Sequence, residues 1–127
     1  MNTRITLTVG AVLLVAASLT ACNGGSSNPV GPTGGGGTPA DVTITINGIS
    51  GGNSFAPNPA TVKVGQTVAW RNADSISHTA TSDATGFNSG TIAAGATSAP
   101  IMMSAAGTFA YHCSFHPTMT GSLVVTP

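Results

Sequence analysis

A thiol, an imidazole and a thioether lie within seven residues near the C-terminus of this 127-residue chain. Cys113, His116 and Met119 are separated by equal steps, in the pattern Cys-x2-His-x2-Met. In the segment before them, residues 108–113, apolar side chains alternate with others as they do in a strand with one buried face. A short loop that leaves such a strand can point all three sulfur and nitrogen side chains at one centre. The pattern therefore predicts that a strand ends near Cys113.

Other short alternating segments precede this one. Residues 42–47 alternate apolar with polar side chains, and residues 61–64 and 67–70 flank a predicted tight turn at Gly65. The inward face of this strand-turn-strand unit is expected to consist of Val62, Val64, Val68 and Trp70. Lys63 is expected to face solvent. Frequent turns and the lack of a long helical period predict an all-β fold, a Greek-key β-sandwich.

The first part of the chain has the composition of an export signal. A basic start is followed by an apolar run over residues 5–17, which is short for a transmembrane span. Residues 19–22, Leu-Thr-Ala-Cys, resemble the lipobox of bacterial lipoproteins, in which the cysteine is lipidated after cleavage. We therefore expect a signal peptide over residues 1–21, lipidation of Cys22 and attachment to a membrane of the cell envelope. Asn23 resembles an outer-membrane sorting signal.

Two further segments follow from composition. Residues 22–40 are rich in glycine, serine and proline and cannot bury enough apolar surface to fold, so we expect a flexible linker. Residues 41–127 are long enough for one sandwich core. With three basic and three acidic side chains, the chain lacks the clustered positive charge that nucleic acid binding requires. Three acidic side chains are also too few to favour catalysis by paired carboxylates.

The residue types near the C-terminus are those of a metal site. Two imidazoles, one thiolate and a weak thioether form the ligand set of a blue-copper electron-transfer centre. Cys113 and His116 supply two of these donors, and His78 is the candidate for the second imidazole. Strand alternation turns His112 away from the side of Cys113, and the chain has only three histidines.

Each donor also has a simpler reading. A lone buried cysteine is usually an apolar core residue, a loop histidine is often only exposed, and methionine is common in cores. Met102 and Met103 are alternatives to Met119, but they precede the strand that leads to Cys113. A disulfide between Cys22 and Cys113 is not expected, because each cysteine has its own chemical use.

The domain resembles the cupredoxin family, and its Cys-x2-His-x2-Met loop is most similar to that of the amicyanins. Residues 62–70 resemble the family's strand-turn-strand before the first histidine, and residues 107–113 and 119–125 resemble its last two strands. The resemblance implies one type 1 copper per chain, bound by His78, Cys113 and His116 with Met119 as axial ligand. It also implies a monomer that shuttles single electrons between redox protein partners and is not an enzyme.

Two residues depart from the family pattern. Thr79 stands where the family often has an asparagine that ties the two ligand segments together, so that tie is expected to be weaker. Phe115 stands where amicyanin and plastocyanin have proline, which lacks a backbone N–H. We hypothesise that the Phe115 N–H donates a hydrogen bond to the Cys113 sulfur and favours Cu(I).

Two other functions use the same residues. A copper nitrite reductase or multicopper oxidase places a histidine beside the type 1 cysteine for a second copper, and His112 has that position. Such a site needs several more imidazoles than this chain contains. A copper carrier or storage lipoprotein would need only the four proposed ligands. A metal-free adhesion domain leaves the Cys-His-Met pattern without a reason.

Overall fold

The computed structural model describes residues 38–127, and the regular structure in this range is almost entirely strand. One short 3-10 helix, η1, spans Gly51–Asn53. The strands are β1 (Val42–Ile46), β2 (Phe55–Ala56), β3 (Ala60–Lys63), β4 (Thr67–Asn72), β5 (Thr81–Ser82), β6 (Ile101–Met102), β7 (Gly107–His112) and β8 (Thr120–Thr126). Among residues 38–127, no helix is long and apolar enough to cross a bilayer.

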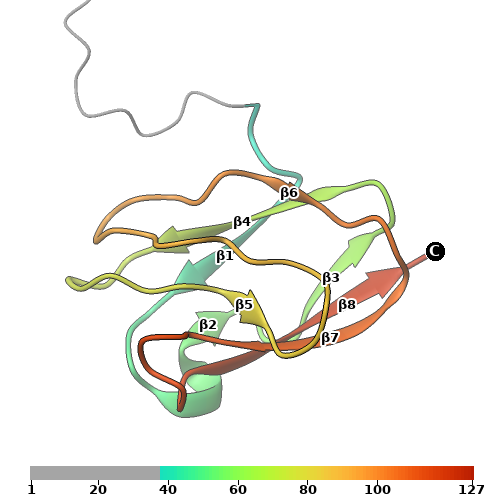
Figure 1. The fold of residues 1–127 in the computed structure, drawn as a ribbon. Helices are drawn as coiled ribbons and strands as arrows, with labels where there is room; N and C mark the ends of the chain where they lie inside the picture. Colours follow the sequence, from blue (N-terminus) through green and yellow to red (C-terminus); the bar gives the residue numbers. More distant parts are fainter. Residues whose placement is uncertain (1–37) are drawn as a thin grey trace, which may run out of the picture. The chain divides into compact units, whose positions relative to one another are not determined.

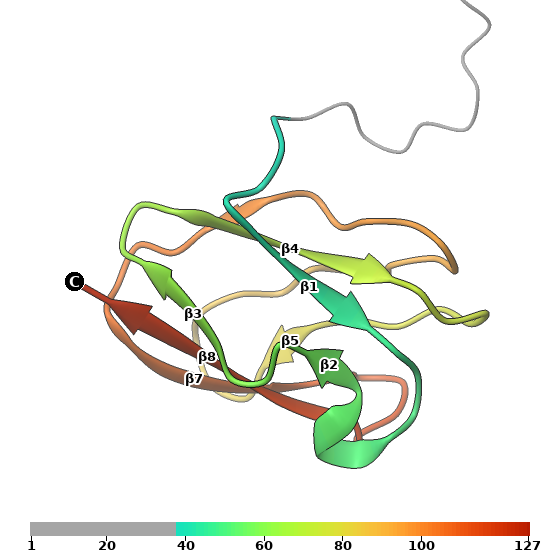
Figure 2. The ribbon, with the colours of Figure 1, turned by 180° about the vertical axis from the view of Figure 1, so that it is seen from behind.

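The strands form two four-stranded sheets that face each other (Figures 1 and 2). One sheet has the order β2-β1-β4-β6, and the other has the order β3-β8-β7-β5. Both sheets are mixed: β1 runs parallel to β4 and β3 runs parallel to β8, whereas β7 and β8 are antiparallel. The predicted all-β sandwich is confirmed.

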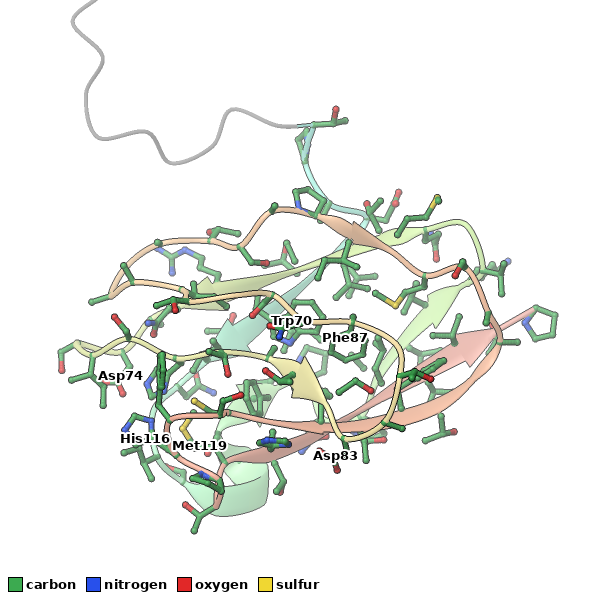
Figure 3. All side chains as sticks on the ribbon, in the orientation of Figure 1. Trp70, Asp74, Asp83, Phe87, His116 and Met119 are labelled. Atoms are coloured by element: carbon green, nitrogen blue, oxygen red, sulfur yellow. The ribbon has the colours of Figure 1, made fainter. Side chains whose placement is uncertain are left out.

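The core lies between the sheets and is dominated by aromatic side chains. Trp70 stacks on Phe87 with ring centroids 5.0 Å apart, and Tyr111 meets Phe55 edge-to-face at 4.8 Å. Figure 3 shows Trp70 and Phe87 in the space between the two layers. Such large rings bury much apolar area and interlock in preferred geometries, which makes this part of the sandwich rigid.

Strand alternation sets which side chains reach this core. In β7, Tyr111 is fully buried, Ala110 is exposed and His112 is partly exposed. Cys113, the next residue after the strand, is also fully buried. The predicted orientation of the strand that leads to Cys113 is therefore confirmed, and it aims the thiol into the molecule.

One prediction about the inward face was wrong. Val62, Val68 and Trp70 are buried as expected, but Val64 is 42% exposed. The reason is that β3 ends at Lys63, and Val64 already belongs to the turn. Gly65 follows with φ of +89°, a conformation that glycine adopts without strain. Lys63 is exposed, as predicted.

The connection after β1 contains η1 and is followed by the short strand β2. The predicted signal peptide, the lipidation of Cys22 and the linker up to residue 37 lie outside the described residues. The domain predicted to begin at residue 41 has its first strand, β1, from Val42.

Candidate metal centre

The candidate ligands come from two segments at one end of the sandwich. His78 follows β4 and forms an isolated antiparallel bridge with Ile92. The His78 N–H donates to the Ile92 carbonyl at 3.1 Å, and the Ile92 N–H donates back to His78 at 2.8 Å. This paired backbone, together with complete burial of the side chain, fixes where the imidazole of His78 points.

The other three candidates lie on the loop between β7 and β8, and this loop is closed by its own backbone. The His116 N–H donates to the Cys113 carbonyl at 3.1 Å, and the Met119 N–H donates to the His116 carbonyl at 2.9 Å. The Cys113 N–H in turn donates to the Met119 carbonyl at 3.1 Å. These successive turns bring residues three apart in sequence to the same side of the loop.

The nitrogen and sulfur donors converge on one point. The Cys113 Sγ lies 3.7 Å from Nδ1 of His78 and 3.7 Å from Nδ1 of His116. The three atoms all lie within 4.8 Å of one another. The sequence placed His78 in this group by elimination, thirty-five residues before Cys113, and the structure brings the two together.

The two sulfur–nitrogen separations match those of a three-coordinate metal site. Metal–sulfur and metal–nitrogen bonds of about 2.3 Å and about 2.0 Å, as for zinc, place sulfur and nitrogen about 3.7 Å apart at an angle of about 120°. A trigonal His2Cys arrangement with a weak thioether is the preference of copper in electron-transfer sites. The residues present therefore fit a copper ion.

Met119 completes the set of candidates. Its side chain is fully buried. Of the two alternatives, Met102 is 64% exposed, and Met103 is buried but hydrogen-bonded through its backbone to the turn between β3 and β4. Figure 3 shows Met119 beside His116 at the same end of the molecule. The loop position of Met119 is therefore the one from which a thioether can approach the site.

The surroundings of Cys113 favour the thiolate, which is the form that binds metal. Burial raises the pKa of the Cys113 thiol, but hydrogen bonds oppose this effect. The strongest of these comes from the backbone N–H of Thr79, and together they lower the pKa from 9.0 to about 6. Cys113 is a free, buried cysteine.

Thr79 ties the two ligand segments together. Its backbone N–H donates to the Cys113 Sγ at 3.3 Å, and its Oγ1 accepts a hydrogen bond from the Ser114 N–H at 2.8 Å. The hydroxyl of Thr81 extends this contact, at 3.2 Å from Thr79 Oγ1 and 3.0 Å from Ser114 Oγ. A threonine therefore connects the two segments without the amide that the family often uses.

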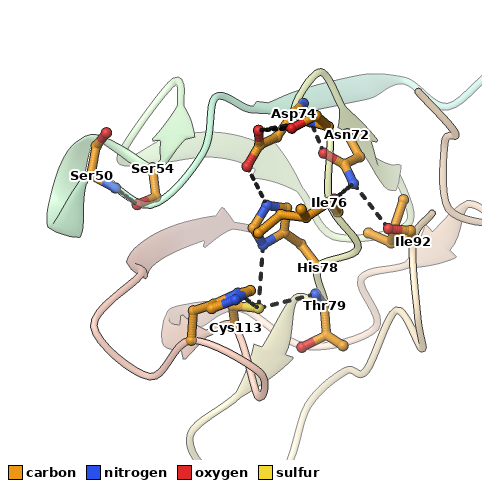
Figure 4. Close-up of polar contacts among 11 residues, drawn as sticks. Ser50, Ser54, Asn72, Asp74, Ile76, His78, Thr79, Ile92 and Cys113 are labelled. Atoms are coloured by element: carbon orange, nitrogen blue, oxygen red, sulfur yellow. Dashed lines mark hydrogen bonds and ion pairs between the residues drawn. The ribbon is translucent and has the colours of Figure 1, made fainter. Parts of the chain in front are cut away.

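Sequence reasoning missed one residue at the site. The Asp74 Oδ2 lies 2.8 Å from Nε2 of His78, on the side of the ring opposite Cys113 (Figure 4). Hydrogen bonds from His78 and from the Ser75 N–H lower the pKa of Asp74, so its carboxylate is ionised and accepts the Nε2 proton. The only signal in the sequence was an acidic residue four positions before a candidate ligand.

His112 lies outside the site, as predicted. Its Nδ1 is 2.5 Å from Oδ1 of Asp83, and both side chains are partly exposed. A buried thiol between two imidazoles in a β-sandwich is the arrangement of a small metalloprotein with a nitrogen-sulfur metal centre.

Comparisons with known proteins agree with this class. A family model described as a cupredoxin-like domain matches residues 10–125. The chain therefore belongs to the cupredoxin-like family, and its cofactor is a type 1 copper. No curated protein sequence matches the chain at a significant level.

Solved structures with the same fold include a purple cupredoxin from Nitrosopumilus maritimus. It is 30% identical with a TM-score of 0.59, and the match covers 68% of this chain and 100% of that chain. A Cu(I) structure of a methionine-to-alanine variant of amicyanin is 23% identical with a TM-score of 0.60, covering 72% and 88%. The reduced state of a proline-to-phenylalanine variant of amicyanin is 27% identical with a TM-score of 0.57, covering 66% and 80%.

Proposed function

We propose that this protein carries single electrons between redox partners, with its copper bound by His78, Cys113 and His116 and with Met119 as the axial ligand. The observation that supports this function most directly is the Cys113 sulfur placed 3.7 Å from a ring nitrogen of each histidine. Bound copper supplies a Cu(II)/Cu(I) couple that exchanges one electron at a time.

The residues around the site suit such an exchange because they hold the donors still. The loop from Cys113 to Met119 is closed by backbone hydrogen bonds, and Thr79 ties it to the His78 segment. Thiolate and thioether ligands favour Cu(I), whereas imidazoles accept both oxidation states. A fixed set of both kinds of donor changes little between the two states, which favours fast transfer.

His116 is the proposed point at which electrons enter and leave. It is partly exposed, whereas the other histidine ligand, His78, is fully buried. Three exposed apolar side chains lie on the loops at this end of the molecule, and we call them the His116 patch: Ile49, Ile76 and Phe115. They are 52%, 42% and 53% exposed.

The loops that carry the three side chains of the His116 patch lie against one another. Gly48 lies against Asp74, because a Cβ built at Gly48 would be 3.2 Å from the Asp74 Oδ2. A Cβ built at Gly51 would be 4.0 Å from the Thr118 carbonyl oxygen. The loops that carry Ile49, Ile76 and Phe115 are therefore neighbours, as Figure 1 shows. Exposed apolar patches of this kind mark docking surfaces, here for redox protein partners.

We propose that the protein is not an enzyme. A second catalytic copper beside Cys113 would need His112 and further imidazoles, but the whole sequence contains only three histidines. His112 is paired with Asp83 on the outer side of the sheet. Copper content above one atom per chain in the purified protein would contradict this proposal.

We also propose that the protein is a monomer that is exported and anchored through lipidated Cys22 to a membrane of the cell envelope. The basic start, the apolar run and the small residue before Cys22 support this location. A Cys22→Ser variant should appear in the soluble fraction, whereas the unaltered protein sediments with membranes. An unaltered protein that is already soluble would contradict the anchor.

The test of electron transfer uses the purified protein with added Cu(II). We expect an intense visible absorption, one copper per chain and a reversible redox response, all lost in a Cys113→Ser variant. A colourless site that holds only Cu(I), without reversible oxidation, would instead establish the copper carrier or storage function. Absorption that survives in Cys113→Ser would contradict the proposed ligand.

A further inference from the structure

The carboxylate of Asp74 lies behind the buried histidine ligand. Its Oδ2 is 2.8 Å from Nε2 of His78, and the opposite ring nitrogen, Nδ1, faces Cys113. The His78 side chain is fully buried, and the Asp74 side chain is only 24% exposed. One ring thus connects a fixed negative charge at the surface to the centre of the site (Figure 4).

The position of Asp74 is built by several hydrogen bonds. The Ser75 N–H donates to its Oδ1 at 2.7 Å, and the Asp74 N–H donates to Oδ1 of Asn72 at 2.9 Å. The Asn72 amide, which is fully buried, donates to the carbonyls of Ile76 at 2.7 Å and Ile92 at 3.0 Å. These contacts hold the carboxylate in one place relative to the segment that carries His78.

We propose that Asp74 is a positioning residue for the copper ligand His78 and that it lowers the reduction potential of the site. This inference rests on the proposed function. By accepting a hydrogen bond from the Nε2–H group, the carboxylate keeps the ring in the tautomer whose Nδ1 has a free lone pair. The same hydrogen bond draws the proton away from the ring and makes Nδ1 a stronger donor.

A stronger donor stabilises Cu(II) more than Cu(I), so Asp74 acts against the effect expected of the Phe115 N–H. Phe115 withdraws charge from the Cys113 sulfur, whereas Asp74 adds donating power at His78. Asp74 at His78 thus opposes the backbone N–H groups of Thr79 and Phe115, which lower the charge on the Cys113 sulfur.

The experiment compares two variants at position 74. Asp74→Leu removes the acceptor, and Asp74→Asn removes the charge but retains an oxygen that accepts the Nε2 proton. We expect Asp74→Leu to lower the affinity for Cu(II) about 10- to 100-fold, with a smaller change for Cu(I), and so to raise the potential. Asp74→Asn is expected to raise the potential less.

A measurement on the metal-free protein distinguishes a positioning role of Asp74 from a general effect on the site. Nitrogen NMR of the metal-free protein reports which ring nitrogen of His78 carries the proton. We expect the Nε2–H tautomer in the unaltered protein and in Asp74→Asn, and a mixture of tautomers in Asp74→Leu. If Asp74→Leu does not fold, Asp74→Asn, which keeps the same shape, still tests the effect on the potential.

Asp83→Asn is the matched control, because Asp83 also pairs with a histidine but His112 does not face the site. This variant should leave the potential and the Cu(II) affinity unchanged. Unchanged values in both Asp74 variants, or an equal rise in potential in Asp83→Asn, would overturn the inference. The proposed function fails separately, if the unaltered protein shows no reversible one-electron redox response.

Discussion

At the scale of single residues, Cys113 is subject to two opposed influences. It is fully buried, yet hydrogen-bond donors from both ligand segments surround its sulfur. The donors outweigh burial and lower the pKa of the thiol to about 6, so the thiolate is favoured in the metal-free protein at neutral pH. A site prepared in this way binds metal without first having to release a proton from sulfur.

This balance predicts a pH dependence in the metal-free protein. The pKa of Cys113 is lowered from 9.0 to about 6, so between these values the unfolded chain binds more protons than the folded one. The free energy of unfolding should therefore rise with pH through this window and lose this contribution as pH falls through about 6. Urea unfolding under reducing conditions measures it, and Cys113→Ser should remove the slope. An equal slope in that variant would contradict the assignment.

Phe115 offers a second prediction at this scale. Its backbone N–H is one of the donors that lower the pKa of Cys113. Phe115→Pro removes this N–H, so the thiolate keeps more charge, Cu(II) is favoured and the reduction potential should fall. Phe115→Ala keeps the N–H and is the control for loss of the ring. With folding intact, an unchanged or higher potential in Phe115→Pro would show the hypothesis to be wrong.

At the scale of elements, the pairing of β7 with β8 depends on the absence of a side chain at Gly121. Gly121 is paired with Tyr111, and a Cβ built there would lie 2.3 Å from the ring carbon Cζ. The ring cannot move easily, because Phe55, Trp70 and Phe87 pack around it. The close approach of β8 to this ring fixes the position of the start of β8, which directly follows Met119.

We therefore expect Gly121→Ala to lower the free energy of unfolding by about 1–3 kcal/mol through overpacking. Gly52→Ala is the control, because a Cβ at Gly52 would meet nothing within 4 Å. Denaturant unfolding measures both. Equal stability of the two variants would mean that β8 shifts freely and that the contact does not matter.

The tie between the ligand segments gives another prediction for elements. Thr79→Val keeps the shape of the side chain but removes the Oγ1 that accepts from the Ser114 N–H, leaving that partly buried N–H without a partner. The cost should be about 1–3 kcal/mol in the metal-free protein. Thr81→Val removes only hydroxyl contacts and should cost less than about 0.5 kcal/mol. Similar costs for both would contradict the role given to Thr79.

At the scale of the whole molecule, the His116 patch and the small number of charges determine how the protein meets others. The chain has three basic and three acidic residues and no formal net charge. Long-range electrostatic steering is therefore weak, and contact depends on apolar surface. Val64, at the far end of the sandwich, is as exposed as Ile76, at 42% each.

Electron exchange between two copies of the protein tests this description. The self-exchange rate should change little with ionic strength. Ile76→Lys places like charges opposite each other when two patches meet, and it should slow self-exchange about tenfold or more. Val64→Lys adds the same charge at the far end and should have little effect. NMR line broadening in mixed oxidation states measures both, and equal slowing would contradict docking at the patch.

The site was predictable from sequence where its geometry is local. Cys113, His116 and Met119 follow one strand at fixed spacing, so strand alternation and loop length nearly determine their arrangement. Asp74 and Ile49 were not predictable, because their roles depend on loops that meet only in the folded sandwich. Val64 was assigned to the wrong face because the strand ends one residue earlier than the apolar pattern does.

The backbone hydrogen bonds that close the loop from Cys113 to Met119 affect how freely its sequence can change. Because main-chain hydrogen bonds hold the turns between Cys113 and Met119, the exposed side chains of Pro117 and Thr118 contribute little to metal geometry. Evolution or design can therefore rewrite these two positions to change which protein is recognised while the metal's environment stays the same.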